Sequence, residues 1–294
     1  MEGVMMRGKT SVAVAVRRED GSISTVTDPL DPLYTGKLRE TPIARGIIAL
    51  IEALVLGVKS ILISAKEFAG PSEKVPGAFF WGAMVIGLAV AVGLFFVLPL
   101  VVMQFFDRYL ASSFLSNLLE GILRLGLFVA YLSLISMMPD IRRVFAYHGA
   151  EHKVINAFEA GAVLDVSEVR KYSTAHVRCG TSFILVVMLL AIVVFALVGR
   201  PSMAFRLGSR IVLIPLIAAV GYEFIRFSAG HAGNKLVRLL LTPGLALQTL
   251  TTRQPDDSQI EVSLAAFKSV LAEDGARSAA AGLEPQRSPV QSPG

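Results

Sequence analysis

The sequence is poor in the residue types that stabilise small secreted proteins and soluble domains. It contains one cysteine, Cys179, among 294 residues, so the chain cannot form an internal disulfide bond. Charged residues make up only 17% of the chain, whereas ordinary soluble domains carry about 25%. Hydrophobic residues make up 53%, which excludes disorder along the whole length. The composition therefore indicates a chain with much of its apolar surface in a membrane.

The sequence also lacks a cleavable signal peptide, because residues 1–27 contain no apolar segment of the required kind, and it shows no internal repeat. Instead, residues 11–27 consist of two alternating apolar and polar segments around an Asp-Gly turn, which predicts a β-hairpin. Residues 28–42 contain three prolines and are expected to form a linker. We expect residues 1–42 to be a cytoplasmic hairpin and linker.

Four apolar segments are long enough to cross a bilayer, which requires about 20 residues in a helix. They are residues 78–106, 114–138, 179–199 and 207–228. The second segment contains Glu120 and Arg124, a pair of opposite charge that can neutralise itself on one helical face. The expected fold is an all-α polytopic membrane protein, with about four transmembrane helices in a membrane domain of residues 43–230.

Residues 43–68 predict a further helix in which four charged residues lie on nearly one face. Arg45, Glu52, Lys59 and Lys66 are seven residues apart, and such a face drifts by only about 20° per heptad. A transmembrane position would bury Glu52 and Lys59 at a cost of about 2.5–3.5 kcal/mol each. We therefore expect an interfacial or re-entrant helix whose polar stripe faces water or protein, with a fifth span as the alternative.

The distribution of Lys and Arg predicts the orientation. Of the 28 Lys and Arg, 23 lie on one side of the expected spans and four on the other. The positive-inside rule then places both termini and the connecting segment 139–180 in the cytoplasm. This accounts for the net charge of +5 without nucleic acid as a partner, and the expected partner is the lipid bilayer.

The residues after the last span predict a cytoplasmic helical segment, 231–273, in two parts. The first is apolar and interrupted by Pro243 and Gly244, and the second follows a capping Asp256 or Asp257. Its apolar residues share one helical face: Ile260, Leu264, Phe267 and Leu271. Residues 274–294 are rich in Ala, Gly, Pro and Ser and are expected to form a disordered tail.

The chemistry concentrates in one connecting segment, which holds three of the four histidines and the cysteine. His148 and His152 are four residues apart and share one helical face, with Glu151 beside them. Two imidazoles at this spacing can bind one metal ion, while Glu151 ligates it or acts as a general base on water. The order His-x-x-Glu-His is the inverted zinc-protease pattern, but four spans and a short loop do not fit that soluble fold.

His176 and Cys179 are three residues apart at the expected start of the third span. Together with His148 and His152 they form a His3Cys set, sufficient for a tetrahedral zinc site. Four protein ligands would make the site structural, and three with an open position would make it catalytic. Simpler roles also stay open: His148 as a cap, Cys179 as a small apolar residue, and Glu151 as the partner of a nearby cation.

Five sequence runs resemble, in order, the signatures of the bacterial YqhQ family, domain-of-unknown-function family 1385. The runs are MEGVMMRG (1–8), YHGAEHK (147–153), RCGTSF (178–183), GYEFIR (221–226) and PGLALQTLTTRQPDD (243–257). The resemblance extends over about residues 1–271. It implies a multi-pass protein of the bacterial inner (plasma) membrane and a metal-dependent enzyme, without naming a reaction.

Our leading hypothesis is a divalent metal ion, zinc by its ligands, at His148, His152 and His176 or Cys179. Glu151 would then be the catalytic base in hydrolysis of a membrane-proximal substrate. The alternative is a scaffold or assembly factor for other membrane proteins, in which the metal is structural. A transporter is the least favoured class, because no repeated half is visible.

Four charged residues in the family motifs are candidates for binding an anionic head group or a peptide. They are Arg7, Arg253, Asp256 and Asp257. The favoured alternative is that they cap helices and hold the hairpin against the membrane domain.

Overall fold

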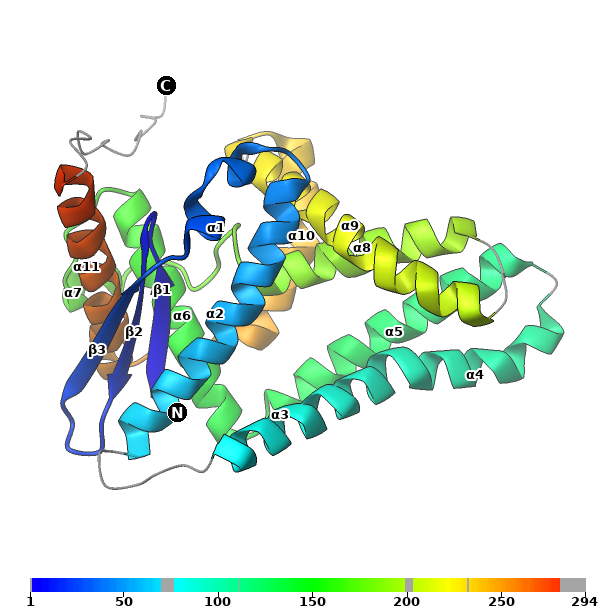
Figure 1. Cartoon of the computed structure of the whole chain (residues 1–294), viewed down its shortest axis with the longest axis horizontal. Helices are drawn as coiled ribbons and strands as arrows, with labels where there is room; N and C mark the ends of the chain where they lie inside the picture. The colour runs from blue at the N-terminus through cyan, green and yellow to red at the C-terminus, as the bar shows by residue number, and fades with distance from the viewer. Residues whose placement is uncertain (1, 70–76, 111, 199–202, 232, 281–294) are drawn as a thin grey trace.

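The computed structural model describes residues 2–69, 77–110, 112–198, 203–231 and 233–280. Helices dominate the fold, as expected, and a small sheet lies near the N-terminus. Figure 1 shows a group of long helices and, at one end of it, a head in which helices cover the sheet.

The sheet of the head has three antiparallel strands in the order β1 (Gly3–Arg7), β2 (Ser11–Arg17) and β3 (Ile23–Pro29). β2 and β3 form the expected hairpin, with Val14 opposite Val26. Its turn contains Gly21 at a φ of 83°, a conformation that glycine adopts without strain. β1 is a third strand that the sequence analysis did not predict.

Two helices far apart in the sequence pack on this sheet, α6 (Pro139–Glu159) and α11 (Asp257–Ala280). Their buried side chains form one core with those of β1 and β2. The core includes Val4, Met6, Ala13, Ala15, Tyr147, Ala150, Val154, Ile260, Val262 and Leu264. A short helix, α7 (Val166–Val169), adds Val169 to the same core. The N-terminal and C-terminal segments are therefore parts of one unit.

Helix α11 extends beyond residue 274, where the disordered tail was expected to begin. Asp274 explains the difference, because its carboxylate accepts hydrogen bonds from the backbone N–H groups of Lys9 (2.5 Å) and Thr10 (3.0 Å). The hydroxyls of Thr10 and Ser11 also donate to it, each at 2.8 Å. These bonds hold the last turns of the helix against the β1–β2 connection. The remainder of the expected tail, 281–294, lies outside the described residues.

Among the described residues, five segments are long and apolar enough to cross a membrane. They are Ala44–Glu67, Trp81–Tyr109, Ser113–Ile135, Gly180–Val198 and Gly208–Gly230. The last four match the spans expected from the sequence. They belong to α3 (Gly77–Val92) with η2 (Gly93–Val97), α4 (Leu98–Phe106) and η3 (Asp107–Tyr109), then α5 (Ser113–Ile135), α8 (Gly180–Val198) and α9 (Met203–Gly230). Most of their apolar side chains face outward, which suits lipid contact.

The first segment belongs to α2 (Ala44–Ala69), which Figure 1 shows crossing between the head and the other long helices. Glu52 of α2 accepts a hydrogen bond from Arg7 (2.9 Å) and pairs with Arg39. Lys59 pairs with Asp28 at 3.0 Å. Glu52 and Lys59 of the polar stripe thus face the N-terminal segment. This agrees with the expectation that the stripe faces protein. By length and composition α2 also qualifies as a span, so there are five candidates instead of four.

The remaining helices lie in the linker and in the segment after the last candidate span. The linker contains the short helices α1 (Pro32–Thr35) and η1 (Lys37–Glu40). The segment expected to break at Pro243 is a single helix, α10 (Lys235–Thr251). Gly244 allows this helix to lie close to α8, because a Cβ there would be 2.9 Å from Ser182 Oγ.

A buried ion cluster connects α5 with α9. Glu120 is 3% exposed and accepts hydrogen bonds from Arg124 (2.6 Å) and from Arg210 (2.5 Å). The i,i+4 pair expected from the sequence is therefore present, with a second arginine added. Arg210 also lies over the ring of Phe195 and Arg124 over that of Phe96. The Glu120 carboxylate and the aromatic faces thus contact both guanidinium groups, and Arg124 also donates to the carbonyl of Phe95 at 2.8 Å.

Candidate metal centre

Three of the four predicted ligands converge where α6, α8 and α10 meet. His148 and His152 lie one turn apart on α6, and Cys179 directly precedes α8. One ligand atom from each of the three lies within 4.8 Å of the others. The closest pair is Cys179 Sγ and His148 Nε2, at 3.3 Å. We call these three residues the His–His–Cys cluster.

Backbone carbonyl groups orient both imidazoles of the cluster. His148 Nδ1 lies 2.8 Å from the carbonyl oxygen of Thr251, and His152 Nδ1 lies 2.6 Å from that of Thr174. A carbonyl can only accept, so each Nδ1 carries the proton and donates it. The Nε2 atoms are then the ligand positions, and a bound metal ion would displace the proton between His148 Nε2 and Cys179 Sγ. Histidines that bind metals are commonly fixed in this way by a hydrogen bond from the other ring nitrogen.

Gly149 explains how the carbonyl of Thr251 reaches His148. The backbone N–H of Arg253 donates to the carbonyl of Phe145 at 2.9 Å, so the segment after α10 crosses directly over α6. A Cβ on residue 149 would lie 2.1 Å from the Arg253 carbonyl oxygen. Only glycine permits this approach, because any side chain would push residues 251–253 away.

His176 does not join the cluster, although the sequence analysis included it among the candidate ligands. Its Nε2 lies 3.3 Å from a carboxylate oxygen of Glu159, and its Nδ1 accepts the backbone N–H of Arg178 at 3.3 Å. Its ring lies beside that of His152, with the centroids 5.8 Å apart. Because other groups engage both ring nitrogens, the structure brings three ligands together and not four.

Glu151 lies beside the cluster on α6 and is half-buried. Within the described part of the chain it forms no hydrogen bond or ion pair. Two of the nearby cations are engaged elsewhere, since Arg143 pairs with Glu2 and Lys153 donates to the carbonyls of Arg170 and Tyr172. Burial raises the pKa of the Glu151 carboxyl, and the neighbouring histidines oppose this rise only in part. A buried carboxyl with a raised pKa beside a possible metal site is a candidate for proton transfer.

Cys179, the one cysteine of the chain, lies in surroundings that strongly change its pKa. Burial opposes its ionisation, but hydrogen bonds with His148 and His152 outweigh burial and lower its pKa to about 5. Burial likewise disfavours the charged form of His148, but the contact with Cys179 raises its pKa to about 9. Thr181 Oγ1 adds a further contact to the sulfur at 3.1 Å. The cysteine is thus a thiolate at neutral pH, which is the form that binds metals.

The sequence analysis did not identify three residues that support the cluster. The carbonyls of Thr174 and Thr251 orient the imidazoles, and no side-chain pattern reveals a carbonyl's direction. Gln248 is buried and binds the backbone of His176, accepting from its N–H at 2.9 Å and donating to its carbonyl at 2.8 Å. Its long polar side chain inside an otherwise apolar helix was the signal available.

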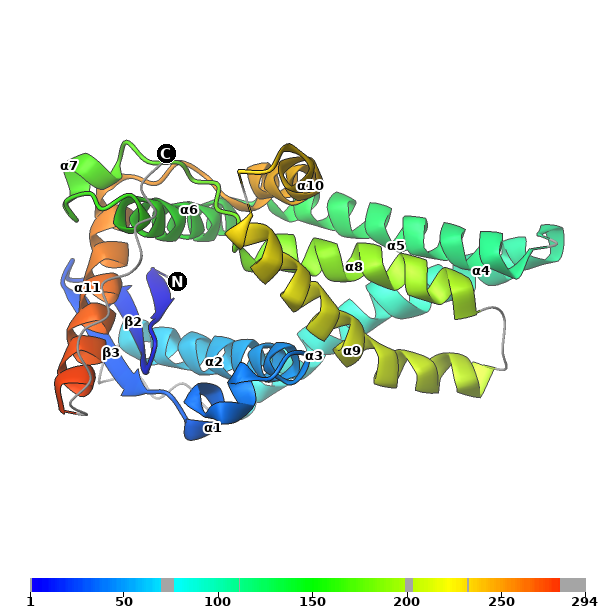
Figure 2. The ribbon, with the colours of Figure 1, turned by 90° about the horizontal axis from the view of Figure 1, so that it is seen from above.

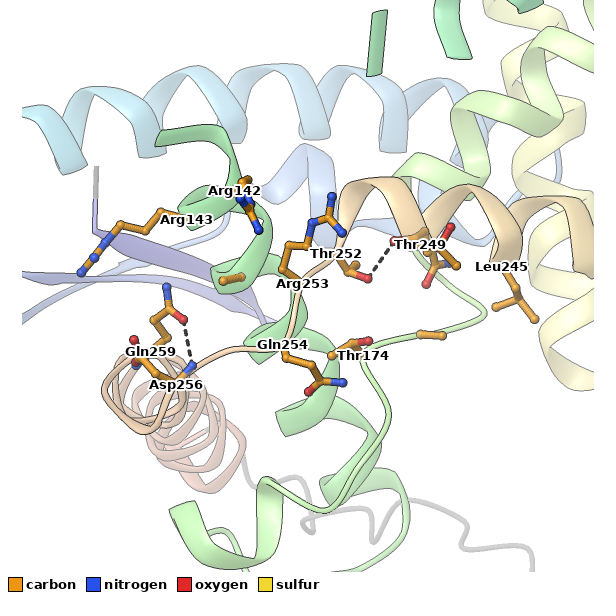
Figure 3. Close-up of a pocket in the computed structure, with 13 residues that line it drawn as sticks. Arg142, Arg143, Thr174, Leu245, Thr249, Thr252, Arg253, Gln254, Asp256 and Gln259 are labelled. Atoms are coloured by element: carbon orange, nitrogen blue, oxygen red, sulfur yellow. Dashed lines mark hydrogen bonds between the residues drawn. The ribbon is translucent and has the colours of Figure 1, made fainter. Parts of the chain in front are cut away.

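A basic cavity of about 730 Å³ lies behind the residues that support the cluster (Figure 3). Thr174 and Gln248 belong to its wall, and Arg142, Arg143 and Arg253 also line it. Two of the four charged motif residues proposed for anions, Arg253 and Asp256, line this cavity. The Arg253 side chain makes no ion pair among the described residues.

The other three motif residues have structural roles. Arg7 binds Glu52 of α2, and Asp257 pairs with the exposed Arg170. Asp256 caps α11 by accepting the N–H of Gln259 at 2.9 Å, and it also lines the basic cavity. For Arg7 and Asp257, the structure therefore agrees with the alternative of holding the parts of the chain together.

Comparison with known proteins identifies relatives of the whole chain. Residues 41–273 match the family described as "Protein of unknown function (DUF1385)". The chain is also 35% identical to "Uncharacterized protein YqhQ" of Bacillus subtilis (strain 168), over 92% of this chain and 90% of that protein. No solved structure matches the chain.

Proposed function

The chain belongs to the DUF1385 family, and we propose that it is a membrane enzyme with a divalent metal ion, zinc, bound by His148, His152 and Cys179. One observation carries the proposal: the donor atoms of these residues converge within 4.8 Å while each histidine Nδ1 is held by a backbone carbonyl. Imidazole and thiolate are the ligands that zinc prefers in proteins.

The number of ligands favours a catalytic site over a structural one. Structural zinc sites are closed by four protein ligands, whereas catalytic sites use three and leave one position open. His176 would be the fourth ligand, but Glu159 and the backbone of Arg178 engage its ring. When bound, zinc would supply a Lewis acid and lower the pKa of water.

Glu151 is the residue we assign to proton transfer in this site. It is adjacent to both histidines in sequence, it lacks a partner among the described residues, and burial raises its pKa. A carboxyl group in this state can take a proton from water and return it to a leaving group. The chemistry is that of a hydrolase. The positive-inside count supports a bacterial plasma-membrane protein with its head and the cluster on the cytoplasmic side.

The second candidate function is a scaffold in which the metal is structural. The cluster favours this in one respect, because it joins three helices, with His148 and His152 from α6, Cys179 at α8, and the Thr251 carbonyl from α10. In that case the metal would stabilise the connection between the head and the spans, and Glu151 would have no essential role.

Metal analysis of the full-length protein, purified in a non-ionic detergent without chelator, tests both functions. We expect about one zinc per chain, less than a tenth of that in His148→Ala, and an unchanged content in Glu151→Gln. His231→Ala serves as the control, because His231 lies at the end of α9 and contacts Phe227. Hydrolysis products from membrane lipids and peptides, measured by mass spectrometry, should disappear in Glu151→Gln.

Three outcomes separate the candidates. Loss of products with retained zinc in Glu151→Gln supports the enzyme. Unfolding of His148→Ala together with normal behaviour of Glu151→Gln supports the scaffold. A wild-type protein without metal at neutral pH contradicts both.

A further inference from the structure

A second cavity, of about 520 Å³, lies where α2, α8 and α9 meet, and Cys179 is part of its wall. The cavity therefore borders the His–His–Cys cluster at Cys179, and it shares no lining residue with the basic cavity. Its volume is in the range of small-molecule sites, about 300–1,000 Å³. Small and apolar side chains form most of the lining: Ala49, Leu50, Ala53, Phe183, Ile225 and Ala229.

The cavity lies at the ends of candidate membrane helices. Its walls come from the start of α8, the last turns of α9 and the first half of α2. Arg45 of α2 pairs with Glu223 of α9, so a charged contact joins these helices next to the cavity. On the outer surface nearby, Leu54 is 64% exposed and Phe227 is also exposed. An apolar cavity at the ends of membrane-length helices, beside exposed apolar side chains, is suited to a ligand that enters from the lipid phase.

The polar part of the lining is cationic. Arg178 and Arg226 belong to it, and no Asp or Glu does. Arg226 is exposed and forms no hydrogen bond or ion pair with the described residues. The Arg178 side chain is 60% exposed and is held only by a 3.4 Å contact with Glu159. Guanidinium groups recognise phosphate through paired hydrogen bonds. The Tyr222 side chain is a further polar group in the wall.

We propose that this cavity binds a membrane lipid with an anionic phosphate head group, and that such lipids are the substrate class of the metal centre. The apolar lining takes the acyl part, while Arg178 and Arg226 bind the phosphate beside Cys179. The binding site is independent of the function proposed above, but the assignment as substrate rests on it. A lipid fits better than a free anion because small and apolar side chains form most of the wall.

Direct lipid binding tests the proposal on the full-length protein in a non-ionic detergent. The probes are phosphatidylglycerol and phosphatidylcholine with identical fluorescent acyl chains. We expect the wild type to bind phosphatidylglycerol about tenfold more tightly. Ala53→Phe, which fills the cavity from an exposed position on α2, should abolish the binding of both. Arg226→Gln should remove the preference for phosphatidylglycerol, and Arg226→Lys should retain part of it.

Two matched controls show that the effects belong to the cavity. Val55→Phe places the same aromatic side chain at an exposed position of α2 that is not part of the cavity, and should bind lipid as the wild type does. Arg238→Gln removes a charge from an exposed position of α10 and should keep the preference. Zinc content should be unchanged in all of these variants, because none alters a ligand of the cluster.

Each other outcome has a defined meaning. Equal affinity for the two lipids, or normal binding by Ala53→Phe, overturns the proposal. Competition by millimolar inorganic phosphate that removes all lipid binding shows a free-anion site and also overturns it. Selective lipid binding by a protein that contains no zinc supports the lipid site and overturns the substrate assignment. Zinc in a protein that binds neither lipid leaves the metal centre standing and overturns the lipid site alone.

Discussion

Two buried polar clusters in this protein differ in the kinds of chemical group that they bring together. Between α5 and α9, Glu120 accepts from both Arg124 and Arg210, and aromatic rings cover the two guanidinium groups. In the His–His–Cys cluster the Nδ1 atoms of both histidines are bonded to backbone carbonyls, while one ligand atom from each of the three residues faces the others.

The difference separates a structural cluster from a candidate ligand site. Buried polar groups are costly unless they are hydrogen-bonded, so natural proteins usually satisfy them internally. In the arginine cluster one carboxylate pairs with two guanidinium groups, which have no lone pair to offer a metal ion. The His–His–Cys cluster instead directs two imidazoles and a thiolate toward one point, where a cation would complete the bonding.

The largest expected effect on stability comes from breaking the arginine cluster between α5 and α9. Glu120→Ala would leave Arg124 and Arg210 in an apolar setting without their carboxylate. Removing one partner of a buried ion pair costs about 3–5 kcal/mol. We expect the variant to unfold at a much lower temperature than the wild type in the same detergent. Glu168→Ala is the control, because Glu168 forms an exposed pair with Lys171. Equal stability of the two variants would show that the arginine cluster contributes nothing.

A smaller effect is expected from disturbing the orientation of the second cluster without removing a ligand. Gly149→Ala would displace the Arg253 carbonyl and, with it, the Thr251 carbonyl that holds His148. Loss of such a supporting hydrogen bond typically lowers metal affinity by about 10- to 100-fold. Zinc affinity can be measured by competition with a chelating dye.

Gly126→Ala provides the matched control for this prediction. A Cβ at residue 126 meets no atom within 4 Å, so the substitution adds the same methyl group without displacing a carbonyl. If Gly149→Ala binds zinc as tightly as Gly126→Ala does, orientation by Thr251 is not needed for metal binding.

The smallest effect on stability is expected for Asp274, a carboxylate outside the membrane-length helices, and this effect depends on pH. Burial opposes ionisation of Asp274, but hydrogen bonds from Lys9, Ser11 and Thr10 outweigh it and lower its pKa. Its stabilisation is therefore complete above the pKa of an unfolded aspartate, about 3.9, and is lost as the pH falls through the lower pKa of the folded state. Asp274→Asn should reduce the free energy of unfolding at pH 7 by about 1–1.5 kcal/mol.

The measurement is unfolding by denaturant at a series of pH values. The difference between the wild type and Asp274→Asn should shrink as the pH falls below about 4, because the wild-type carboxylate becomes protonated. Glu273→Gln, which affects a partly exposed helical ion pair, should show no comparable pH dependence. A difference that is constant with pH would exclude the ionised carboxylate as its source.

Local patterns in the sequence predicted the elements that depend on local physics. The apolar segments gave four membrane-length helices, and the Asp-Gly turn gave the β2–β3 hairpin. Strand β1 was missed because residues 3–7, GVMMR, lack the regular alternation of a half-buried strand. It forms because α6 and α11 cover one face of the sheet. This contact joins distant parts of the chain, so no local pattern contains it.

The same distinction applies to the candidate metal centre. Helical spacing placed His148, Glu151 and His152 together, and the structure has them on one helix. Proximity in sequence also suggested that His176 and Cys179 act together, but Gln248 holds the His176 backbone and Glu159 contacts its ring. One of these partners is 72 residues away, so its effect follows from tertiary packing.

The joining of the two ends of the chain in the head has a consequence for biosynthesis. The ribosome makes β1, β2 and β3 first, whereas α11, which covers them, emerges only after every membrane-length helix has been made. Until then, Val4, Met6, Ala13 and Ala15 lack the partners that bury them in the finished protein. Exposed apolar surface of this kind attracts chaperones and proteases. Chains that stall before residue 257 would thus be marked for removal by their own unfinished N-terminus.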